Sequence, residues 1–199
     1  MKKNQACLVV LIYLSLVSCG PSKKVTVYDT SKVIVILPDA PVSVGKIVGY
    51  DSVQLKYAMR LLVSQDAIKN IKLYTFIDQW MHTPYKWGGT SKKGIDCSAF
   101  IQLLLTEVYG ISIPRTSVQQ FLMQQVEQFS SKNHLSEGDL VFFKTIDNTI
   151  VSHVGLYLQN RMFINSSSSK GVSIACLDDP YWKKRYVAAG RVKTNLVRK

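Results

Sequence analysis

The feature that most constrains this chain is a turn-rich stretch, residues 84–94, that leads into an apolar run beginning at Cys97. A proline, a Gly-Gly pair and a third glycine lie among polar residues in this stretch, which is typical of a tight loop. Residues 97–109 are mainly apolar and are followed by Gly110, so they predict a buried helix. Asp96 stands where a helix N-cap would stand. The sequence therefore predicts a cysteine in the first turn of a buried helix, directly after a glycine-rich loop.

The position of Cys97 favours a reactive thiol. The partial positive charge at a helix N-terminus stabilises a thiolate relative to a thiol, and it can lower the usual cysteine pKa of about 8.5 into the neutral range. The alternative is a small buried hydrophobe, which is the usual fate of a single cysteine. A cysteine that only packs does not require three glycines and an aspartate before it. We therefore interpret Cys97 as a nucleophile.

The order of the predicted elements indicates an α+β fold. Helical spacing predicts helices over residues 51–64, 70–81, 97–109 and 117–128, with Asn70 as a cap of the second one. A turn and strand over residues 135–143, then short strands over 152–158, 161–165, 171–176 and 186–192, follow these helices. Helices that precede a run of strands favour an antiparallel sheet packed against the nucleophile helix.

The N-terminus has the features of an export signal. Lys2 and Lys3 precede an apolar run at residues 7–17, which is shorter than the span of about 20 residues that crosses a membrane. The run ends in a small residue followed by Cys19, a pattern that resembles a bacterial lipobox. This predicts a signal peptide at residues 1–18 and a lipid on Cys19. An ordinary signal peptide with an incidental cysteine is the alternative.

The charge of the chain points to anionic partners. The formal net charge is +12, which favours anionic surfaces and polymers. For an exported protein these are phospholipid head groups and cell-wall polymers. Nucleic acid is not expected, because the chain is predicted to be exported and carries no recognisable nucleic-acid-binding motif.

The loop and helix start resemble a known active site. Pro84, Tyr85, Trp87, Gly88 and Gly89, followed by Asp96, Cys97 and Ser98, resemble the active-site segment of the NlpC family of bacterial cell-wall cysteine peptidases. Ala99 stands where that family usually has glycine. The resemblance covers about residues 70–192, and it implies a papain-like α+β fold with the nucleophile helix packed on the antiparallel sheet. The expected domains are the signal peptide at 1–18, a lipid-anchored tether and extension at 19–69, and a peptidase domain at 70–199.

A cysteine nucleophile needs a base, and the chain has three histidines, His82, His134 and His153. His82 ends a helical pattern and His134 lies in a polar stretch, whereas His153 opens the strand predicted at 152–158. A strand histidine is more often structural than catalytic. The segment that begins at His153, however, resembles the His-Val-Gly strand of the NlpC family, and this implies that His153 is the base.

Asn165 is the expected third member of the catalytic set, since it lies on the next predicted strand. Its amide oxygen can accept a hydrogen bond from one ring nitrogen of His153 and leave the other to face sulfur. Many members of the NlpC family have histidine here, but asparagine is also a polar orienting group, as in other papain-like sites. A turn asparagine before a serine run is the alternative reading.

Further site residues follow from the resemblance. It implies that the Tyr85 hydroxyl joins the Cys97 backbone N–H in stabilising the oxyanion, although Tyr85 can also be a packing aromatic. Positions equivalent to Asp96, Ser98 and Ser152 help relatives to bind the free amine or the acidic stem peptide of the substrate. Arg115 can contact a substrate carboxylate, or it can be a surface charge.

These features predict an exported, lipid-anchored cysteine endopeptidase of the bacterial cell envelope that cleaves peptidoglycan stem peptides through a thioester. The bond is a γ-D-glutamyl–diamino acid bond or a D,D cross-link, and the sequence leaves both open. We expect no metal or organic cofactor, and we expect a monomer. The alternatives are an amidase or acyltransferase on the same scaffold and a catalytically silent wall-binding lipoprotein; the complete set of Cys97, His153 and Asn165 argues against silence.

Overall fold

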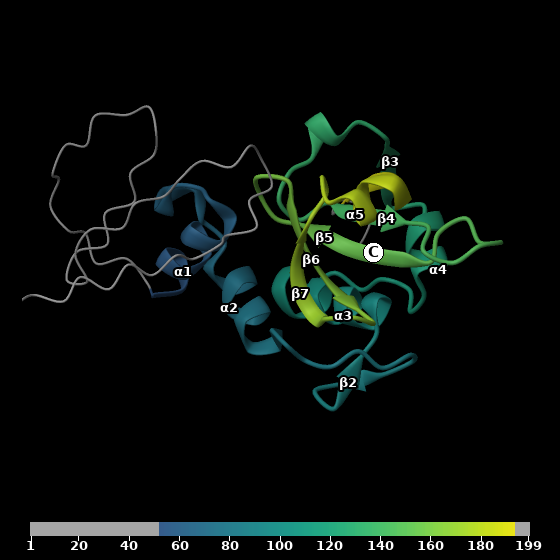
Figure 1. Ribbon diagram of the computed structural model, residues 1–199, viewed down its shortest axis with the longest axis horizontal. Helices are drawn as coiled ribbons and strands as arrows, with labels where there is room; N and C mark the ends of the chain where they lie inside the picture. Colours follow the sequence, from purple (N-terminus) through teal and green to yellow (C-terminus); the bar gives the residue numbers. More distant parts are fainter. Residues whose placement is uncertain (1–51, 194–199) are drawn as a thin grey trace, which may run out of the picture. The chain divides into compact units, whose positions relative to one another are not determined.

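A six-stranded antiparallel sheet forms the centre of the part of the chain that the structure describes, residues 52–193 of a computed structural model (Figure 1). The strand order is β3-β8-β4-β5-β6-β7. The strands are β3 (Val126–Phe129), β4 (Leu140–Phe143), β5 (His153–Tyr157), β6 (Met162–Ser167), β7 (Gly171–Cys176) and β8 (Tyr186–Val192). Every neighbouring pair in this sheet is antiparallel, which confirms the predicted α+β class.

Helix α3 (Cys97–Leu104) is the buried helix of the fold, and it packs on β5 and β6. Phe100, Ile101 and Leu104 are fully buried, so the apolar run that predicted this helix supplies its packing face. The helix continues as one π-helical segment, η2 (Leu105–Tyr109), and Gly110 ends it in the left-handed conformation at φ 69°. The predicted helix and its glycine stop are thus confirmed, with a change of helix type in the second half.

The opposite face of the sheet carries a second apolar cluster under helix α5 (Pro180–Arg185). The register pairs Phe143 with His153 and Tyr157 with Phe163, so these side chains share one face of the pleated sheet. Trp182 of α5 packs into this cluster, whose buried members are Val141, Phe143, Tyr157, Phe163, Leu177 and Trp182. His153 therefore starts β5 on the face that α5 covers.

Two N-terminal helices, α1 (Ser52–Leu61) and α2 (Ile71–Trp80), precede the glycine-rich loop, with a short 3-10 turn, η1 (Gln65–Ala67), between them. Asn70 caps α2 by accepting from the Leu73 N–H at 3.1 Å, as predicted. The turn between β5 and β6 holds the α1–η1 segment, because Gln159 donates to the Ala67 carbonyl and Asn160 donates to the Leu61 carbonyl, both at 2.8 Å. A domain boundary near residue 69 stays a prediction.

One predicted helix is shorter than expected, and one helix was missed. The helix predicted over residues 117–128 is α4 (Ser117–Leu122), after which the chain turns and forms β3 on the edge of the sheet. The helix α5 was not predicted, although Asp179 caps it and Pro180 opens it. The structure also contains a small hairpin, β1 (Thr90–Ser91) and β2 (Gly94–Ile95), within the expected loop.

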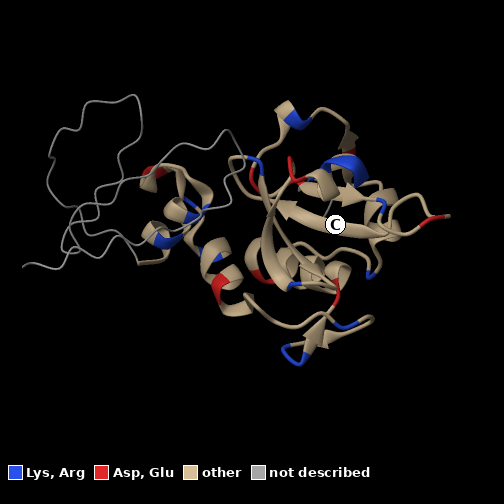
Figure 2. Cartoon of the chain, viewed as in Figure 1, with Lys and Arg blue, Asp and Glu red and all other residues tan. Residues whose placement is uncertain are grey.

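Basic residues lie on two elements near the start of α3 and β5 (Figure 2). The turn of the β1–β2 hairpin carries exposed Lys92 and Lys93, and the last turn of α5 carries Lys183, Lys184 and Arg185. The segment Lys132–His134 forms a further short 3-10 turn, η3.

The predicted signal peptide at 1–18, the lipid site at Cys19 and most of the extension at 19–69 lie outside the described residues. Among residues 52–193, no helix is both long enough and apolar enough to cross a membrane.

Candidate active site

Cys97 is the first residue of α3, and its thiol is free. Asp96 precedes it in extended conformation, and its side chain accepts from the Ala99 N–H at 2.8 Å, so the predicted N-cap is confirmed. Cys97 is 7% exposed. Cys97 is the free cysteine of the described residues.

The glycine-rich loop is bound to the start of α3 by Asp96. Its carboxylate accepts from the Gly88 N–H at 3.0 Å, and its own N–H donates to the Gly89 carbonyl at 3.2 Å. A Cβ at Gly89 would lie 2.4 Å from the Gly94 carbonyl oxygen, so any larger residue would push the hairpin apart. The glycines therefore serve the close approach that presents Cys97.

His153 and Asn165 form a buried pair. The Nε2 atom of His153 lies 3.1 Å from Oδ1 of Asn165, and Nδ2 of Asn165 donates to the Ser173 carbonyl at 3.1 Å. The second bond fixes the amide, because a carbonyl accepts only from the NH₂ group. Oδ1 must then accept from His153, so Nε2 carries the ring proton and Nδ1 is left as the acceptor.

Cys97 and His153 meet where β5 begins. The β5–β6 ladder consists of Leu156 paired with Ile164 and Tyr157 paired with Phe163. The backbone amide of Val154, the residue after His153, lies close enough to the Cys97 sulfur to lower the pKa of the thiol. The nucleophile therefore lies beside the residue that follows the histidine. The structure thus brings together Cys97, His153 and Asn165, which are far apart in sequence.

The protonation of the pair differs from the sequence prediction. Burial raises the pKa of the Cys97 thiol to about 11, although the hydrogen bond from Val154 lowers it in part. Burial also lowers the pKa of His153 to about 4, against the hydrogen bond from Asn165, which raises it. The predicted lowering of the Cys97 pKa is contradicted, because desolvation of a nearly covered sulfur exceeds the effect of the helix N-terminus. These shifts favour the neutral form of both side chains.

Tyr85 lies near the sulfur. The loop pairs Tyr85 with Ile95 in an isolated bridge, and the Ile95 N–H donates to the Pro84 carbonyl at 3.0 Å. Burial, followed by the charges of Cys97 and Asp96, raises the pKa of the half-buried Tyr85 hydroxyl. Its phenol therefore stays protonated and can donate a hydrogen bond.

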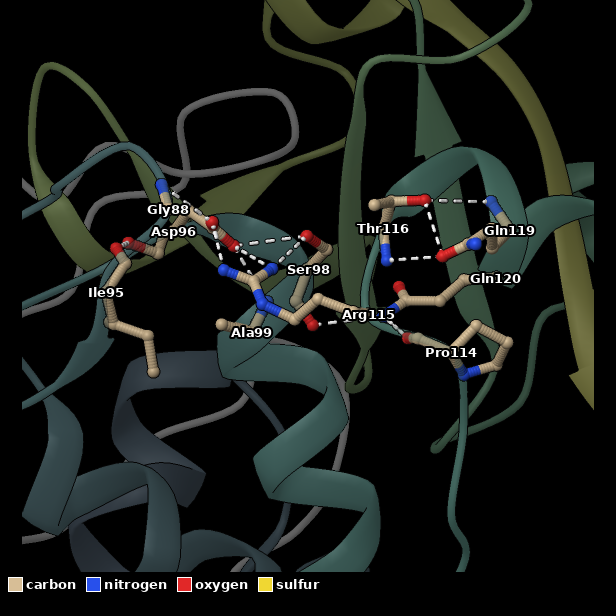
Figure 3. A network of polar contacts seen from close by, with 11 residues as sticks. Gly88, Ile95, Asp96, Ser98, Ala99, Pro114, Arg115, Thr116, Gln119 and Gln120 are labelled. Carbon is tan, nitrogen blue, oxygen red and sulfur yellow. Dashed lines mark hydrogen bonds and ion pairs between the residues drawn. The ribbon is translucent and has the colours of Figure 1, made fainter.

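Asp96, Ser98 and Arg115 form one polar network (Figure 3). Arg115 makes a bidentate ion pair with Asp96, at 2.6 and 3.0 Å, and also donates to the Ser98 hydroxyl at 3.0 Å. Burial raises the pKa of Asp96, but the bonds from Arg115 and the Ala99 N–H outweigh it, so the net pKa is lowered. Arg115, which is 36% exposed, is thus not an isolated surface charge.

Ser152 makes its hydrogen bonds outside this network, and so do the other two histidines. The Ser152 hydroxyl accepts from the Thr145 and Ile146 backbone N–H groups at 2.7 and 3.0 Å, and so closes the loop between β4 and β5. His82 and His134 are exposed. Among residues 52–193, no group of His, Cys, Asp or Glu side chains is arranged to hold a metal ion.

Three residues that support the site were missed from the sequence. Gln120 is fully buried and donates to the Ser98 and Pro114 carbonyls at 3.0 and 2.8 Å, which ties the Arg115 segment to α3. Ser166 donates to the Ile95 carbonyl at 2.8 Å, and Trp182 stacks on His153. The Asp-Pro pair before Trp182 was a helix-start signal that could have indicated α5; nothing in the sequence marked the other two.

The sequence also matches a known protein family. The model of the NlpC/P60 family matches residues 82–191, which is more than half of the chain. A Haemophilus influenzae protein named "Probable endopeptidase NlpC homolog" is 39% identical over 120 residues, 60% of this chain and 61% of that protein. The Escherichia coli "Murein DD-endopeptidase MepS/Murein LD-carboxypeptidase" is 37% identical over 140 residues, 66% of this chain and 72% of that protein.

Solved structures show the same relationship. An NlpC/P60 family protein from Bacillus cereus superposes with a TM-score of 0.55 at 32% identity, covering 62% of this chain and 40% of that one. A lipoprotein-like NLP/P60 protein from Staphylococcus aureus gives a TM-score of 0.55 at 30% identity, covering 62% and 41%. The expected family is confirmed: the chain belongs to the NlpC/P60 family.

Proposed function

We propose that this protein is a cysteine endopeptidase that hydrolyses an amide bond in the stem peptides of peptidoglycan. The observation that carries the proposal is the placement of a free thiol at a helix start, beside a buried His153–Asn165 pair whose Nδ1 is left as the acceptor. The names of the E. coli and H. influenzae relatives, a murein endopeptidase and a probable endopeptidase, support the substrate class.

The neutral pair defines the first chemical step. Nδ1 of His153 accepts the proton of the Cys97 thiol as the sulfur attacks the amide carbonyl carbon, which gives a tetrahedral oxyanion and an imidazolium. The imidazolium then donates its proton to the departing amine as the C–N bond breaks, and a thioester remains. His153 next takes a proton from water, whose oxygen attacks the thioester. The C–S bond breaks, the acid leaves, and the proton returns to the thiol.

The oxyanion needs donors at the place where charge develops. The backbone N–H of Cys97, at the start of α3, is one proposed donor, since the first N–H groups of a helix lack an intrahelical partner. The Tyr85 hydroxyl is the second, because it lies near the sulfur and stays protonated.

The proposed substrate contacts centre on the network of Asp96, Ser98 and Arg115 beside the nucleophile. A carboxylate of the stem peptide can reach the partly exposed guanidinium of Arg115, and a free amine can reach Asp96. Ser152, in the loop that leads into His153, is a further proposed substrate contact. The basic residues of the β1–β2 hairpin and of α5 add a long-range attraction for an acidic peptide (Figure 2).

Mass spectrometry of purified muropeptides tests the function and decides the bond. Hydrolysis of the D,D cross-link converts dimers into monomers with the gain of one water, whereas hydrolysis after γ-D-glutamate shortens the stem of a monomer. Unchanged masses for both substrate sets with folded protein whose Cys97 thiol is free would overturn the proposal, and alkylation of Cys97 by iodoacetamide should abolish any hydrolysis that is seen.

Replacing Asn165 tests the orienting role. Asn165→Ala should lower kcat by about 10- to 100-fold and change KM little, because ring orientation matters chiefly in the transition state. Asn165→His should retain most of the activity, since one ring nitrogen can donate to the Ser173 carbonyl and the other can accept from His153. Steady-state rates on muropeptides measure both variants. Hydrolysis by Asn165→Ala at the wild-type rate would show that another group orients the histidine.

The proposal also includes a lipid anchor on Cys19 of an exported, monomeric chain. Metabolic labelling with a fatty-acid analogue should mark the wild type and Cys7→Ala, but not Cys19→Ala. Cys7→Ala is the matched control, because it removes a cysteine from the same leader region. Equal labelling of Cys19→Ala and the wild type would exclude the anchor.

The expected monomer is checked separately, by the molecular mass that sedimentation gives for the chain without its leader.

A further inference from the structure

Trp182 lies directly against His153, the proposed base. The indole and imidazole centroids are 5.0 Å apart, and the two rings are inclined by 31°, close to an offset stack. Trp182 is 9% exposed and His153 is 6% exposed, so each ring covers the other from solvent. The indole therefore forms one wall of the chamber in which the imidazole sits.

The indole is held in place from several sides. Phe143 lies 4.9 Å from it and Phe163 lies 5.3 Å from it at 89°, so two strands of the sheet support the ring. The short helix that carries it is fixed at its start, where Asp179 accepts from the Tyr181 N–H at 2.8 Å and Pro180 sets the backbone. A tryptophan this constrained presents a rigid face to His153.

We propose that Trp182 is a positioning residue of this site: it fixes the plane of the His153 imidazole and keeps water away from the hydrogen bond between His153 and Asn165. The inference rests on the proposed cysteine peptidase function. The hydrogen bond between His153 and Asn165 selects the imidazole tautomer that carries its proton on Nε2. Water that reached Nε2 or Oδ1 would compete for this hydrogen bond.

The surroundings of His153 make the effect of Trp182 separable from other charges. Within residues 52–193, the aromatic rings in contact with His153 are those of Phe143 and Trp182, neither of which titrates. The titratable groups on the elements packed here are Cys97 and Asp96 at the start of α3, Tyr85 in the loop, Tyr157 on β5, Tyr186 on β8, and Tyr181, Lys183, Lys184 and Arg185 on α5. All of them remain in a Trp182 variant, so a change in the titration of His153 would report the loss of the indole.

Two substitutions of Trp182 test the inference, with a matched control in the same cluster. Trp182→Ala should lower kcat by about 10- to 100-fold with KM within about twofold, because orientation is lost and no substrate contact is removed. Trp182→Phe should recover a large part of the rate by restoring an aromatic cover. Phe163→Leu removes an aromatic ring that supports Trp182 rather than His153, so it should lower thermal stability with a much smaller effect on kcat.

NMR titration of the histidines measures the pKa of His153, which would not change if Trp182 had a purely structural role. The chain has three histidines, and the exposed His82 and His134 serve as internal references. The pKa of His153 should rise towards the ordinary value of about 6.5 in Trp182→Phe and further in Trp182→Ala, because burial is the main cause of its depression. It should stay low in Phe163→Leu.

An unchanged His153 titration in both Trp182 variants, or an equal shift in Phe163→Leu, would overturn the inference. A rise in kcat that accompanies the higher pKa would also overturn it, since basicity rather than orientation would then limit the rate. If Trp182→Ala does not fold, Trp182→Phe carries the test alone. Because the NMR titration needs no substrate, it decides the role of Trp182 even if the wild-type protein cleaves no muropeptide.

Discussion

Cys97→Ala should abolish muropeptide hydrolysis, with a loss of at least about 10⁴-fold in kcat, the scale seen when the nucleophile of a catalytic unit is removed. Sulfur is the atom that forms the thioester, and alanine cannot replace it. The fold should persist, because Asp96 still caps α3 through the Ala99 N–H and α3 keeps its buried face of Phe100, Ile101 and Leu104.

Mass spectrometry of muropeptides and far-ultraviolet circular dichroism measure the two parts of this prediction. Cys97→Ser is a useful companion, since it keeps the size of the side chain but supplies a far weaker nucleophile at the same place. Full turnover by Cys97→Ala would end the cysteine mechanism, whereas loss of activity together with loss of the dichroism spectrum would report a structural role for the thiol.

His153→Ala should produce the second large loss, about 10²- to 10⁴-fold in kcat, because His153 is the group proposed to accept the thiol proton. The neutral imidazole is the active form, and burial holds the pKa of His153 at about 4. Wild-type kcat/KM should therefore rise as the pH increases through about 4 and stay high to neutral pH, rather than turning on near the ordinary histidine pKa of about 6.5.

His134→Ala is the matched control, because His134 is exposed and lies on the η3 turn. It should leave both the rate and the acid limb unchanged. The thiol provides a separate check: with its pKa raised to about 11, iodoacetamide alkylation of Cys97 in the free protein should keep accelerating from neutral into alkaline solution. A plateau across neutral pH would mean that a thiolate–imidazolium pair already exists at rest.

The parts of this protein that the sequence could predict are those governed by nearby residues. Asn70 and Asp96 were identified as caps because a short acceptor before a helical pattern satisfies N–H groups a few residues away. Gly110 was identified as a stop because a left-handed residue ends a helix. The family resemblance added His153 and Asn165, whose hydrogen bond the structure now shows.

The parts that escaped prediction depend on distant partners. Residues 117–128 have a helical composition, but Val126 and Phe129 pair with β8 from the far end of the chain, and that pairing outweighs the local preference. The charge state of Cys97 escaped for a related reason: the helix N-terminus can be read locally, whereas the burial that raises its pKa comes from the packed fold.

The hydrogen bond from Ser166 to the Ile95 carbonyl has a consequence for how the proposed site is assembled. It joins residues 71 positions apart, and it links β6, which carries Asn165, to the segment that presents Cys97. Closing a loop of this length costs chain entropy that only the packed fold repays. The proposed nucleophile and its proposed orienting group are therefore brought together by the tertiary fold and not by either segment alone.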